Sequence, residues 1–211
     1  MFAVDHLVYA APELDAACRQ IEALTGVTPS FGGVHGHGLS HNALIGLGPD
    51  CYLEIYAPTP GTTPTSEGAD DWIEFCCGLD APRLMTVCLR PDIDMSALAR
   101  RAQNGHLTME GPDRWSRTRP DGMTLEWVLL EPIMPEHDFL VPFFIDWLDS
   151  PHPSGDAPQG CALHSLTYQT SQPESLEAVF RTLGLDASAI RKGMTNRVRA
   201  SLQTPKGLIA L

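Results

Sequence analysis

The sequence predicts an α+β fold in which repeated βαββ(β) units form a curved mixed β-sheet half-barrel with helices outside. Two observations carry this prediction. A strand-like segment, a helical segment and two further strand-like segments follow one another, and the same order returns about 79 residues later and again, in shorter form, near the C-terminus. A Pro-acidic-apolar-Asp signature marks the first two helix starts, at residues 12–15 and 91–94. Such units cannot bury their sheet faces alone, so we expect one domain over residues 1–211, with units of approximately 1–60, 80–133 and 160–211.

The first unit is the clearest. Residues 4–10 are apolar, β-branched and aromatic, which favours a strand. Pro12 and the acidic residues beside it are typical of a first helical turn, and Gly26 ends the helical spacing. A Gly- and His-rich loop is expected from residue 32 to 38, before two strands. These strands are predicted at residues 41–47 and 51–57, on either side of a tight turn at 48–50.

The other two units repeat this order less closely. Residues 83–90 predict a strand, a helix then runs to Gly105, and a hairpin turn at 119–122 leads into a closing strand at 124–130. A connector over residues 132–158 contains one apolar piece. In the third unit, the predicted strands are residues 161–170, 198–203 and 208–211, with a helix after Pro173.

The composition and net charge limit the kinds of partner that we expect the protein to bind. The chain has 211 residues, of which 14 are Lys or Arg and 26 are Asp or Glu, and its net charge is −12. This charge disfavours nucleic acid and an anionic membrane surface, because both are bound mainly by neutralising phosphates. No apolar run approaches the roughly 20 residues that span a bilayer, and the N-terminus has no signal-peptide pattern. We therefore expect a cytoplasmic protein with reduced cysteines, a small-molecule ligand and a homodimeric assembly.

Two polar residues stand at unusual positions in the predicted strands. Period-2 alternation places His6 on one face with Val4 and Val8, and Glu54 on one face with two tyrosines. Buried polar groups need partners, and imidazole with carboxylate is a common set of metal ligands. The alternative is a satisfied core histidine and a glutamate that faces solvent.

Several blocks of the sequence resemble the bacterial glyoxalase-like domain family of the vicinal oxygen chelate superfamily, which includes glyoxalase I, resistance proteins and extradiol dioxygenases. The blocks are Asp5-His6-Leu7-Val8-Tyr9-Ala10, Ser40-His41-Asn42-Ala43-Leu44, Cys51-Tyr52-Leu53-Glu54, Ser116-Arg117-Thr118-Arg119-Pro120-Asp121-Gly122, Pro142-Phe143-Phe144-Ile145-Asp146-Trp147 and Ser150-Pro151-His152-Pro153. The resemblance spans roughly residues 4–180 and implies paired units around a central cup.

In that superfamily the cup commonly holds a divalent metal, so the resemblance implies His6 and Glu54 as ligands of Zn, Ni, Mn or Fe. The second unit departs from the pattern. A shift of 79 residues puts Met85 where His6 stands, and Glu126 lies one residue from the place that corresponds to Glu54. In the third unit, His164 has a different spacing. The sequence therefore predicts two ligands and leaves the rest of a metal site open.

Besides His6 and Glu54, further residues are candidates for catalysis or substrate binding. We expect Glu54, Arg117 and His152 to be catalytic, with Arg117 binding an anionic oxygen bidentately and His152 carrying a proton. His41, Asn42, Arg117 and Trp147 are expected to contact the substrate. The pair His35 and His37 either adds metal ligands or is a solvated part of the loop.

These residues support two functions. The first is an enzyme of lyase, isomerase or dioxygenase type that acts on a small oxygenated metabolite, with or without a divalent metal. The second is a metal-free protein that binds or sequesters a small compound, as resistance proteins do. A third hypothesis is that the cup serves only as a scaffold for oligomerisation, and it predicts no ligand-binding pocket.

Overall fold

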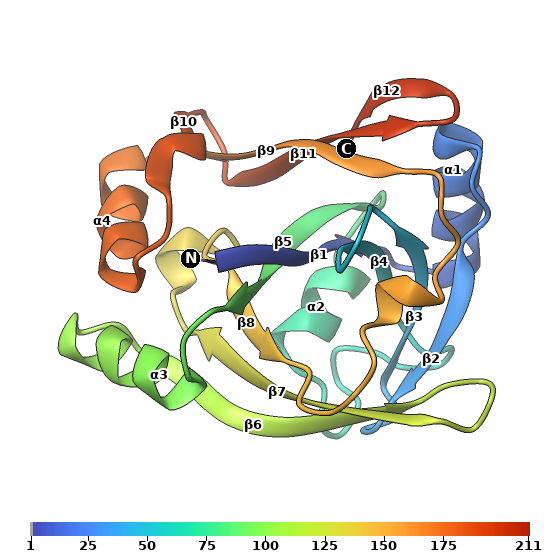
Figure 1. Ribbon diagram of the computed structural model, residues 1–211, viewed down its shortest axis with the longest axis horizontal. Helices are drawn as coiled ribbons and strands as arrows, with labels where there is room; N and C mark the ends of the chain where they lie inside the picture. Colours follow the sequence, from blue (N-terminus) through green and yellow to red (C-terminus); the bar gives the residue numbers. More distant parts are fainter. Residues whose placement is uncertain (1) are drawn as a thin grey trace.

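The computed structural model describes residues 2–211, which form two β-sheets with four α-helices. Eight strands make a closed barrel in the order β1-β4-β3-β2-β6-β7-β8-β5. Its strands are β1 (Phe2–Ala10), β2 (Ser30–His35), β3 (Ser40–Gly46), β4 (Tyr52–Pro58), β5 (Arg83–Pro91), β6 (Met109–Thr118), β7 (Thr124–Pro132) and β8 (Phe143–Asp146). The helices are α1 (Leu14–Thr25), α2 (Asp71–Cys77), α3 (Met95–Asn104) and α4 (Pro173–Leu183). The predicted fold class is confirmed: the sheet is curved and mixed, and the helices lie outside it (Figure 1).

The barrel consists of two units with the same strand pairing. In the first unit β1 is parallel to β4, which pairs antiparallel with β3 and then β2. In the second unit β5 is parallel to β8, which pairs antiparallel with β7 and then β6. Antiparallel pairs β1–β5 and β2–β6 join the units. The apolar piece within the expected connector is thus the strand β8, which completes the second unit.

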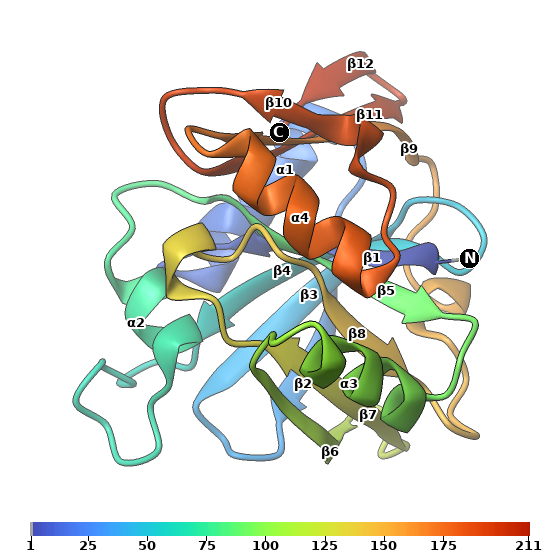
Figure 2. The same ribbon diagram turned by 90° about the vertical axis from the view of Figure 1, so that its left-hand side faces the viewer.

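The third unit repeats the order of elements but not their pairing. Its strands are β9 (Ala162–Thr170), β10 (Ile190–Lys192), β11 (Arg197–Thr204) and β12 (Gly207–Ala210), arranged as β10-β9-β11-β12. Here the first strand lies inside the sheet, whereas β1 and β5 are the first strands of their four-stranded units. This sheet forms a separate layer over one side of the barrel (Figures 1 and 2).

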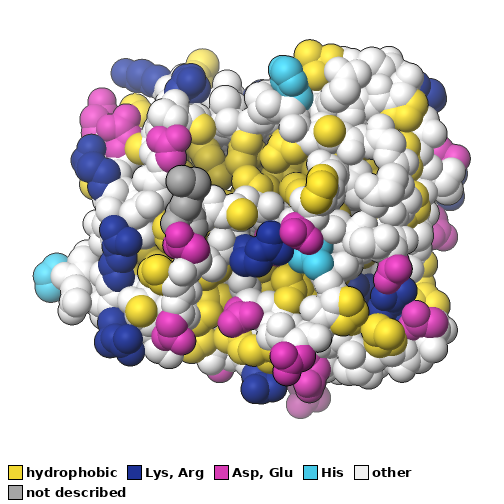
Figure 3. Space-filling view, in the orientation of Figure 1, with side chains coloured by type: hydrophobic (Ala, Val, Ile, Leu, Met, Phe, Trp, Pro, Cys, Tyr) yellow, Lys and Arg dark blue, Asp and Glu magenta, His cyan; other side chains and the backbone are white. Residues whose placement is uncertain are grey.

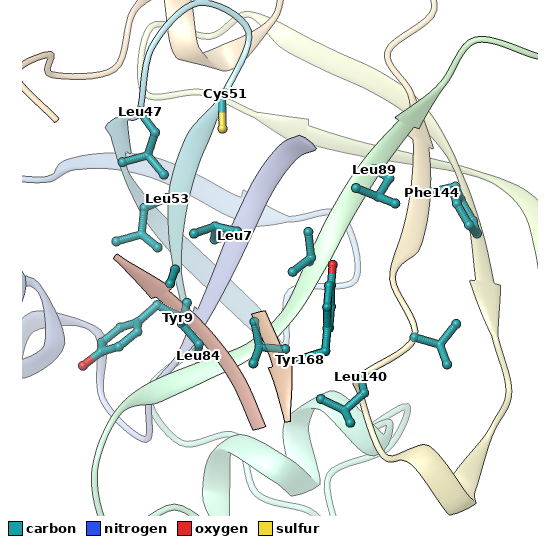
Figure 4. Packing of buried hydrophobic residues seen from close by; sticks show 14 of the residues in the cluster. Leu7, Tyr9, Leu47, Cys51, Leu53, Leu84, Leu89, Leu140, Phe144 and Tyr168 are labelled. Carbon is teal, nitrogen blue, oxygen red and sulfur yellow. The ribbon is translucent and has the colours of Figure 1, made fainter. Parts of the chain in front are cut away.

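Two hydrophobic clusters follow from this layering. The larger one fills the space between the barrel wall and the second sheet, where Leu7 and Tyr9 of β1 share a cluster with Tyr168 of β9 (Figure 4). The smaller one lies inside the barrel and includes Val8 and Trp127. Alternate residues of β1 therefore pack into different cores, as the two faces of a buried strand require.

A bulge in β1 changes the expected set of inward residues. The pairing slips between Val4↔Leu89 and His6↔Cys88, so Asp5 is an extra residue. As a result Val4 packs with the outer cluster, while His6 lines the barrel interior. The prediction that Val4 shares a face with His6 and Val8 was wrong, because the bulge reverses the alternation at Asp5.

Local capping interactions account for both ends of the first helix. The Glu13 carboxylate accepts hydrogen bonds from the backbone N–H groups of Asp15 and Ala16, and Gly26 ends α1 in the left-handed conformation with φ 79°. Both ends agree with the prediction.

The expected loop at residues 32–38 is shorter than predicted, because β2 extends to His35.

The described residues include no helix long and apolar enough to cross a membrane. On the face shown in Figure 3, acidic side chains are interspersed with basic ones, so this face presents no large basic patch. A single domain over residues 1–211 and a homodimeric assembly stay predictions, which limited proteolysis and light scattering would test.

Candidate functional site

A cavity of about 820 Å³ occupies the interior of the barrel. Its walls come from both units. We call its mouth the end lined by α2 and by the segment that precedes β8, because most of the lining residues exposed to solvent lie there. The polar residues of its inner part include His6, His35, Asn42, Glu54 and Arg117. An aromatic-walled cavity with a few convergent polar groups is the usual form of a small-molecule site.

Glu54 is the centre of the inner polar group. Its side chain is only 8% exposed and accepts a hydrogen bond of 2.6 Å from Asn42 Nδ2. His6 Nε2 lies 3.5 Å from Oε2, and His35 Nε2 lies 3.6 Å from Oε1. Burial alone would raise the pKa of Glu54, but the proximity and charge of His35, the charge of His6 and the hydrogen bond from Asn42 outweigh it and lower the pKa to about 2. Glu54 is thus a buried carboxylate that stays ionised at neutral pH.

The Asp5 carboxylate forms hydrogen bonds with two histidines, His6 and His152. Asp5 Oδ1 accepts a 2.8 Å hydrogen bond from His6 Nδ1, and Oδ2 accepts a 3.1 Å bond from His152 Nε2. Trp147 Nε1 donates to the same carboxylate at 3.1 Å. Burial opposes ionisation, but the bonds from His152 and His6 outweigh it and hold the pKa of Asp5 well below its usual range. Asp5 therefore fixes the orientation of His6.

Arg117 and Asn42 carry buried polar atoms that lack a partner. Arg117 is 4% exposed and Asn42 is 3% exposed, yet Arg117 Nη1 and Asn42 Oδ1 form no hydrogen bond in the described chain. Both atoms approach Gly32 so closely that a Cβ at this position would overlap them. A buried donor and a buried acceptor without partners are costly, and these two lie side by side against the backbone of β2, while other parts of both side chains line the cavity.

The mouth of the cavity is acidic. Glu131, at the end of β7, lies opposite Glu110 of β6, and Asp70 and Asp113 line the same end. Burial and the charges of Glu110 and Asp70 raise the pKa of Glu131 to about 7, although a hydrogen bond with Trp72 opposes them. Glu131 therefore titrates near neutrality, unlike Glu54 in the inner part of the same cavity.

Replacing Glu131 with Gln is expected to stabilise the protein at pH 8 and to change little at pH 5. A carboxyl whose folded pKa is raised contributes stability below its unfolded pKa, and this contribution is lost as the pH rises through about 7. The gain at pH 8 has an upper bound of about 3 kcal/mol, which thermal melts at the two pH values would measure. An equal effect of E131Q at both pH values would contradict the raised pKa.

The second unit does not supply matching metal ligands. β5 carries its own bulge at Met85, between the pairs Val8↔Thr86 and Tyr9↔Leu84, so Thr86 follows this bulge as His6 follows Asp5. β4 places Glu54 beside Val8, and β8 places Phe143 beside Cys88, the residue two after Thr86. The counterparts of His6 and Glu54 are thus Thr86 and Phe143, and Thr86, not Met85, corresponds to His6.

This donor set fits a divalent ion poorly. A three- or four-ligand site needs imidazole, carboxylate or thiolate donors, and Phe143 offers none. One group, Asp5, His6 and Cys88, has donor atoms within 4.8 Å of one another. However, Asp5 already accepts hydrogen bonds at both oxygens, and burial raises the pKa of the Cys88 thiol well above its ordinary value. We therefore derive no step through a metal.

The structure brings most of the predicted site residues together. His6, Asn42, Glu54, Arg117 and Trp147 all line the cavity. His152 is not among the cavity-lining residues: it bonds Asp5 and lies edge-on to the rings of Tyr52 and Trp147. His41 points away, with its ring 6.2 Å from that of the half-exposed Phe31, because neighbouring residues of β3 alternate between the two faces. Glu126 is exposed on the outer face of β7 and His164 is exposed on β9.

Two contributors to the site, Asp5 and Glu131, were not identified from the sequence, and a third, His35, was predicted in the wrong element. Strict alternation puts Asp5 on the opposite face from His6, and only the bulge turns it towards the site. His35, for which one of the two alternatives was a further metal ligand, belongs to the strand β2 rather than to a loop, and its Nδ1 lies 2.8 Å from Ser40 Oγ. Glu131 has no sequence signal, because its pKa depends on acids contributed by β6 and by the N-cap of α2.

Comparison with known proteins identifies the relatives of this fold. A family model described as "Glyoxalase-like domain" matches residues 4–184, whereas no curated protein matches the chain. A hypothetical protein from Staphylococcus aureus has a similar structure at 15% identity, with a TM-score of 0.71 over 100% of this chain and 98% of that one. A methylmalonyl-CoA epimerase in complex with methylmalonyl-CoA and NH4+ matches at 15% identity, with a TM-score of 0.50 over 71% and 97% of the two chains. A methylmalonyl-CoA epimerase from Streptomyces coelicolor gives a TM-score of 0.49 at 15% identity, over 72% and 98%.

Proposed function

The chain belongs to the glyoxalase-like domain family of the vicinal oxygen chelate superfamily, and on this premise we propose that its barrel is the active site of an isomerase, epimerase or lyase. The reaction is the removal of a proton from carbon next to a carboxylate or carbonyl of a small oxygenated substrate. One observation carries the proposal: a buried, ionised Glu54 lies in the same cavity as a buried guanidinium with an unpartnered N–H.

Each inner residue has a part in this reaction. Glu54 accepts the proton from carbon, and the electron pair moves to the neighbouring oxygen. Arg117 stabilises the oxyanion that forms, because a charge-assisted hydrogen bond in a water-poor cavity is strong. Asn42 keeps the Glu54 carboxylate in place through its hydrogen bond, and His6, which Asp5 orients, lies beside that carboxylate. Return of the proton to carbon gives an isomer or epimer, and loss of a leaving group gives a lyase product.

The polar side chains of the inner end also suggest the reacting end of the substrate. Arg117 and Asn42 line this end of the cavity next to each other. A 2-hydroxy acid suits this pair, since its carboxylate can accept from the guanidinium while its hydroxyl bonds the amide. We therefore place 2-hydroxy and 2-oxo acids first among the candidates.

Deuterium incorporation tests this function. The protein is incubated in D2O with 2-hydroxy acids, 2-oxo acids and an acyl thioester, the last because a neighbouring fold binds methylmalonyl-CoA, and proton NMR follows the C–H next to the carbonyl. We expect exchange with at least one class, and a decrease of about 10²–10⁴-fold in Glu54→Gln. Glu126→Gln, the same change on the outer face of β7, is the matched control and should exchange at the wild-type rate. Absence of exchange, or equal rates in Glu54→Gln and wild type, would overturn the proposal.

A second function rests on the counterpart positions in the second unit. Thr86 and Phe143 leave the cavity without a complete ligand set, and its walls are aromatic, which also suits a metal-free protein that binds a small compound. This alternative predicts tight binding without deuterium exchange, so the same experiment separates the two functions.

A further inference from the structure

The acidic mouth of the cavity is unusual because its charges are not compensated. Within residues 2–211, no ion pair links Asp70, Glu110, Asp113 or Glu131 to a Lys or Arg. Burial, together with the charges of Glu110, Asp70 and Asp113, raises the pKa of Glu131. Surface carboxylates repel one another at little cost when solvated, but these surround a half-buried side chain.

Aromatic rings cover the same end of the cavity. Trp72 of α2 lies edge-on to Tyr56 and to Phe143, with ring centroids 5.3 Å apart in both cases. Phe75 packs against Phe139 at 5.1 Å. This cluster already holds one cation, since the Arg83 guanidinium carbon lies 4.8 Å from the centroid of the Phe75 ring.

The inner end of the cavity carries the opposite charge, that of the Arg117 guanidinium. Arg117 pairs across β6–β7 with Leu125, six residues before Glu131 on β7, so the two ends lie roughly 20 Å apart along the strands. At that inner end, the buried Nη1 of Arg117 lacks an acceptor. An unpartnered cation at one end and uncompensated carboxylates beside aromatic rings at the other call for a ligand with opposite charges at its two ends.

We propose that the mouth formed by Trp72, Phe75, Glu110 and Glu131 is a binding site for an ammonium group, and that the substrate is an elongated zwitterion. Its carboxylate or carbonyl end lies at Arg117 and its ammonium end lies between the aromatic rings and the mouth carboxylates. This inference rests on the proposed function for the inner end only. The same carboxylates disfavour a ligand whose far end carries phosphate groups.

Calorimetric binding of two probes tests the site without any need for catalysis. The probes are 12-aminododecanoate and dodecanoate, which share a carboxylate and a chain long enough to reach from one end of the cavity to the other, but differ in the ammonium group. A purely apolar mouth prefers dodecanoate, because burying an ammonium costs solvation. At pH 8 and low salt, we expect the wild type to bind 12-aminododecanoate about tenfold more tightly.

The variants separate the two ends. In the double variant Glu110→Gln/Glu131→Gln the preference should disappear or reverse, while Glu126→Gln, on the outer face of the same strand as Glu131, should keep it. Arg117→Met should weaken both probes to the same extent. Thermal melts confirm that each variant is folded.

Three results would overturn the ammonium site: equal or tighter binding of dodecanoate by the wild type, a preference that survives in the double variant, and binding of neither probe. The deuterium-exchange experiment stands apart from these results. Exchange that depends on Glu54 without an ammonium preference refutes the mouth site alone, and an ammonium preference without exchange refutes the proposed reaction alone.

Discussion

Asp5→Asn is expected to lower the free energy of unfolding by about 3 kcal/mol at pH 7, which corresponds to a Tm lower by roughly 6–12 °C in a chain of this size. The Asp5 carboxylate is fully buried and accepts hydrogen bonds from His6, Trp147 and His152. An amide retains one acceptor and turns its NH2 group towards N–H donors, so buried donors lose their partner.

The effect depends on pH in a defined direction. Because the pKa of Asp5 is lowered in the folded protein, its stabilisation is present above the unfolded pKa and is lost as the pH falls through and below it. The difference between variant and wild type should therefore be large at pH 7 and shrink in acid. Asp50→Asn is the matched control. Arg90 lies 3.4 Å from Asp5 and 4.0 Å from Asp50, but the Asp50 side chain is 66% exposed. Equal destabilisation by both variants would contradict the role assigned to Asp5.

Arg117→Met is expected to weaken the binding of mandelate, an aromatic 2-hydroxy acid, by about 10–100-fold. The same change should leave the unfolding free energy unchanged or higher, because it replaces a buried guanidinium that has an unpartnered N–H with an apolar side chain of similar length. Burial lowers the pKa of Arg117, which reflects the same desolvation. Lost affinity together with retained or increased stability distinguishes a ligand-binding arginine from a structural one.

Arg119→Met provides the control for this prediction. Arg119 lies two residues further along the chain but pairs with Asp121 and Asp156 and is absent from the cavity lining. Its removal should leave mandelate affinity at the wild-type level. Calorimetric titrations and thermal melts of the two variants measure both quantities, and a loss of stability in Arg117→Met without a loss of affinity would contradict the account.

The sequence contained enough to predict the fold and the inner half of the site. Hydrophobic alternation, the repeated Pro-acidic helix starts and Gly26 predicted most strands and the first helix correctly. His6, Asn42, Glu54 and Arg117 could be selected because polar residues within apolar strands need partners. The pairing of the third unit could not be predicted, because the same order of elements is compatible with more than one strand arrangement.

The parts that were missed depend on backbone irregularity or on distant contacts. One extra residue in β1 moves Val4 to the outer core and brings Asp5 to His6, and a bulge has no reliable signature in a single sequence. The matching bulge in β5 makes Thr86, rather than Met85, the counterpart of His6. The acidic mouth combines residues of α2, β6 and β7, which only the closed barrel brings together.

The location of a bound 2-hydroxy acid tests the central claim most directly. In a crystal structure with mandelate, the account predicts a carboxylate oxygen within about 2.7–3.2 Å of a guanidinium nitrogen of Arg117 and the C2 atom roughly 3–3.5 Å from a Glu54 oxygen. Its phenyl ring should point along the cavity towards Trp72. Mandelate bound outside the barrel, or bound with its carboxylate at Glu131 and away from Arg117, would contradict the assignment of this cavity as the active site.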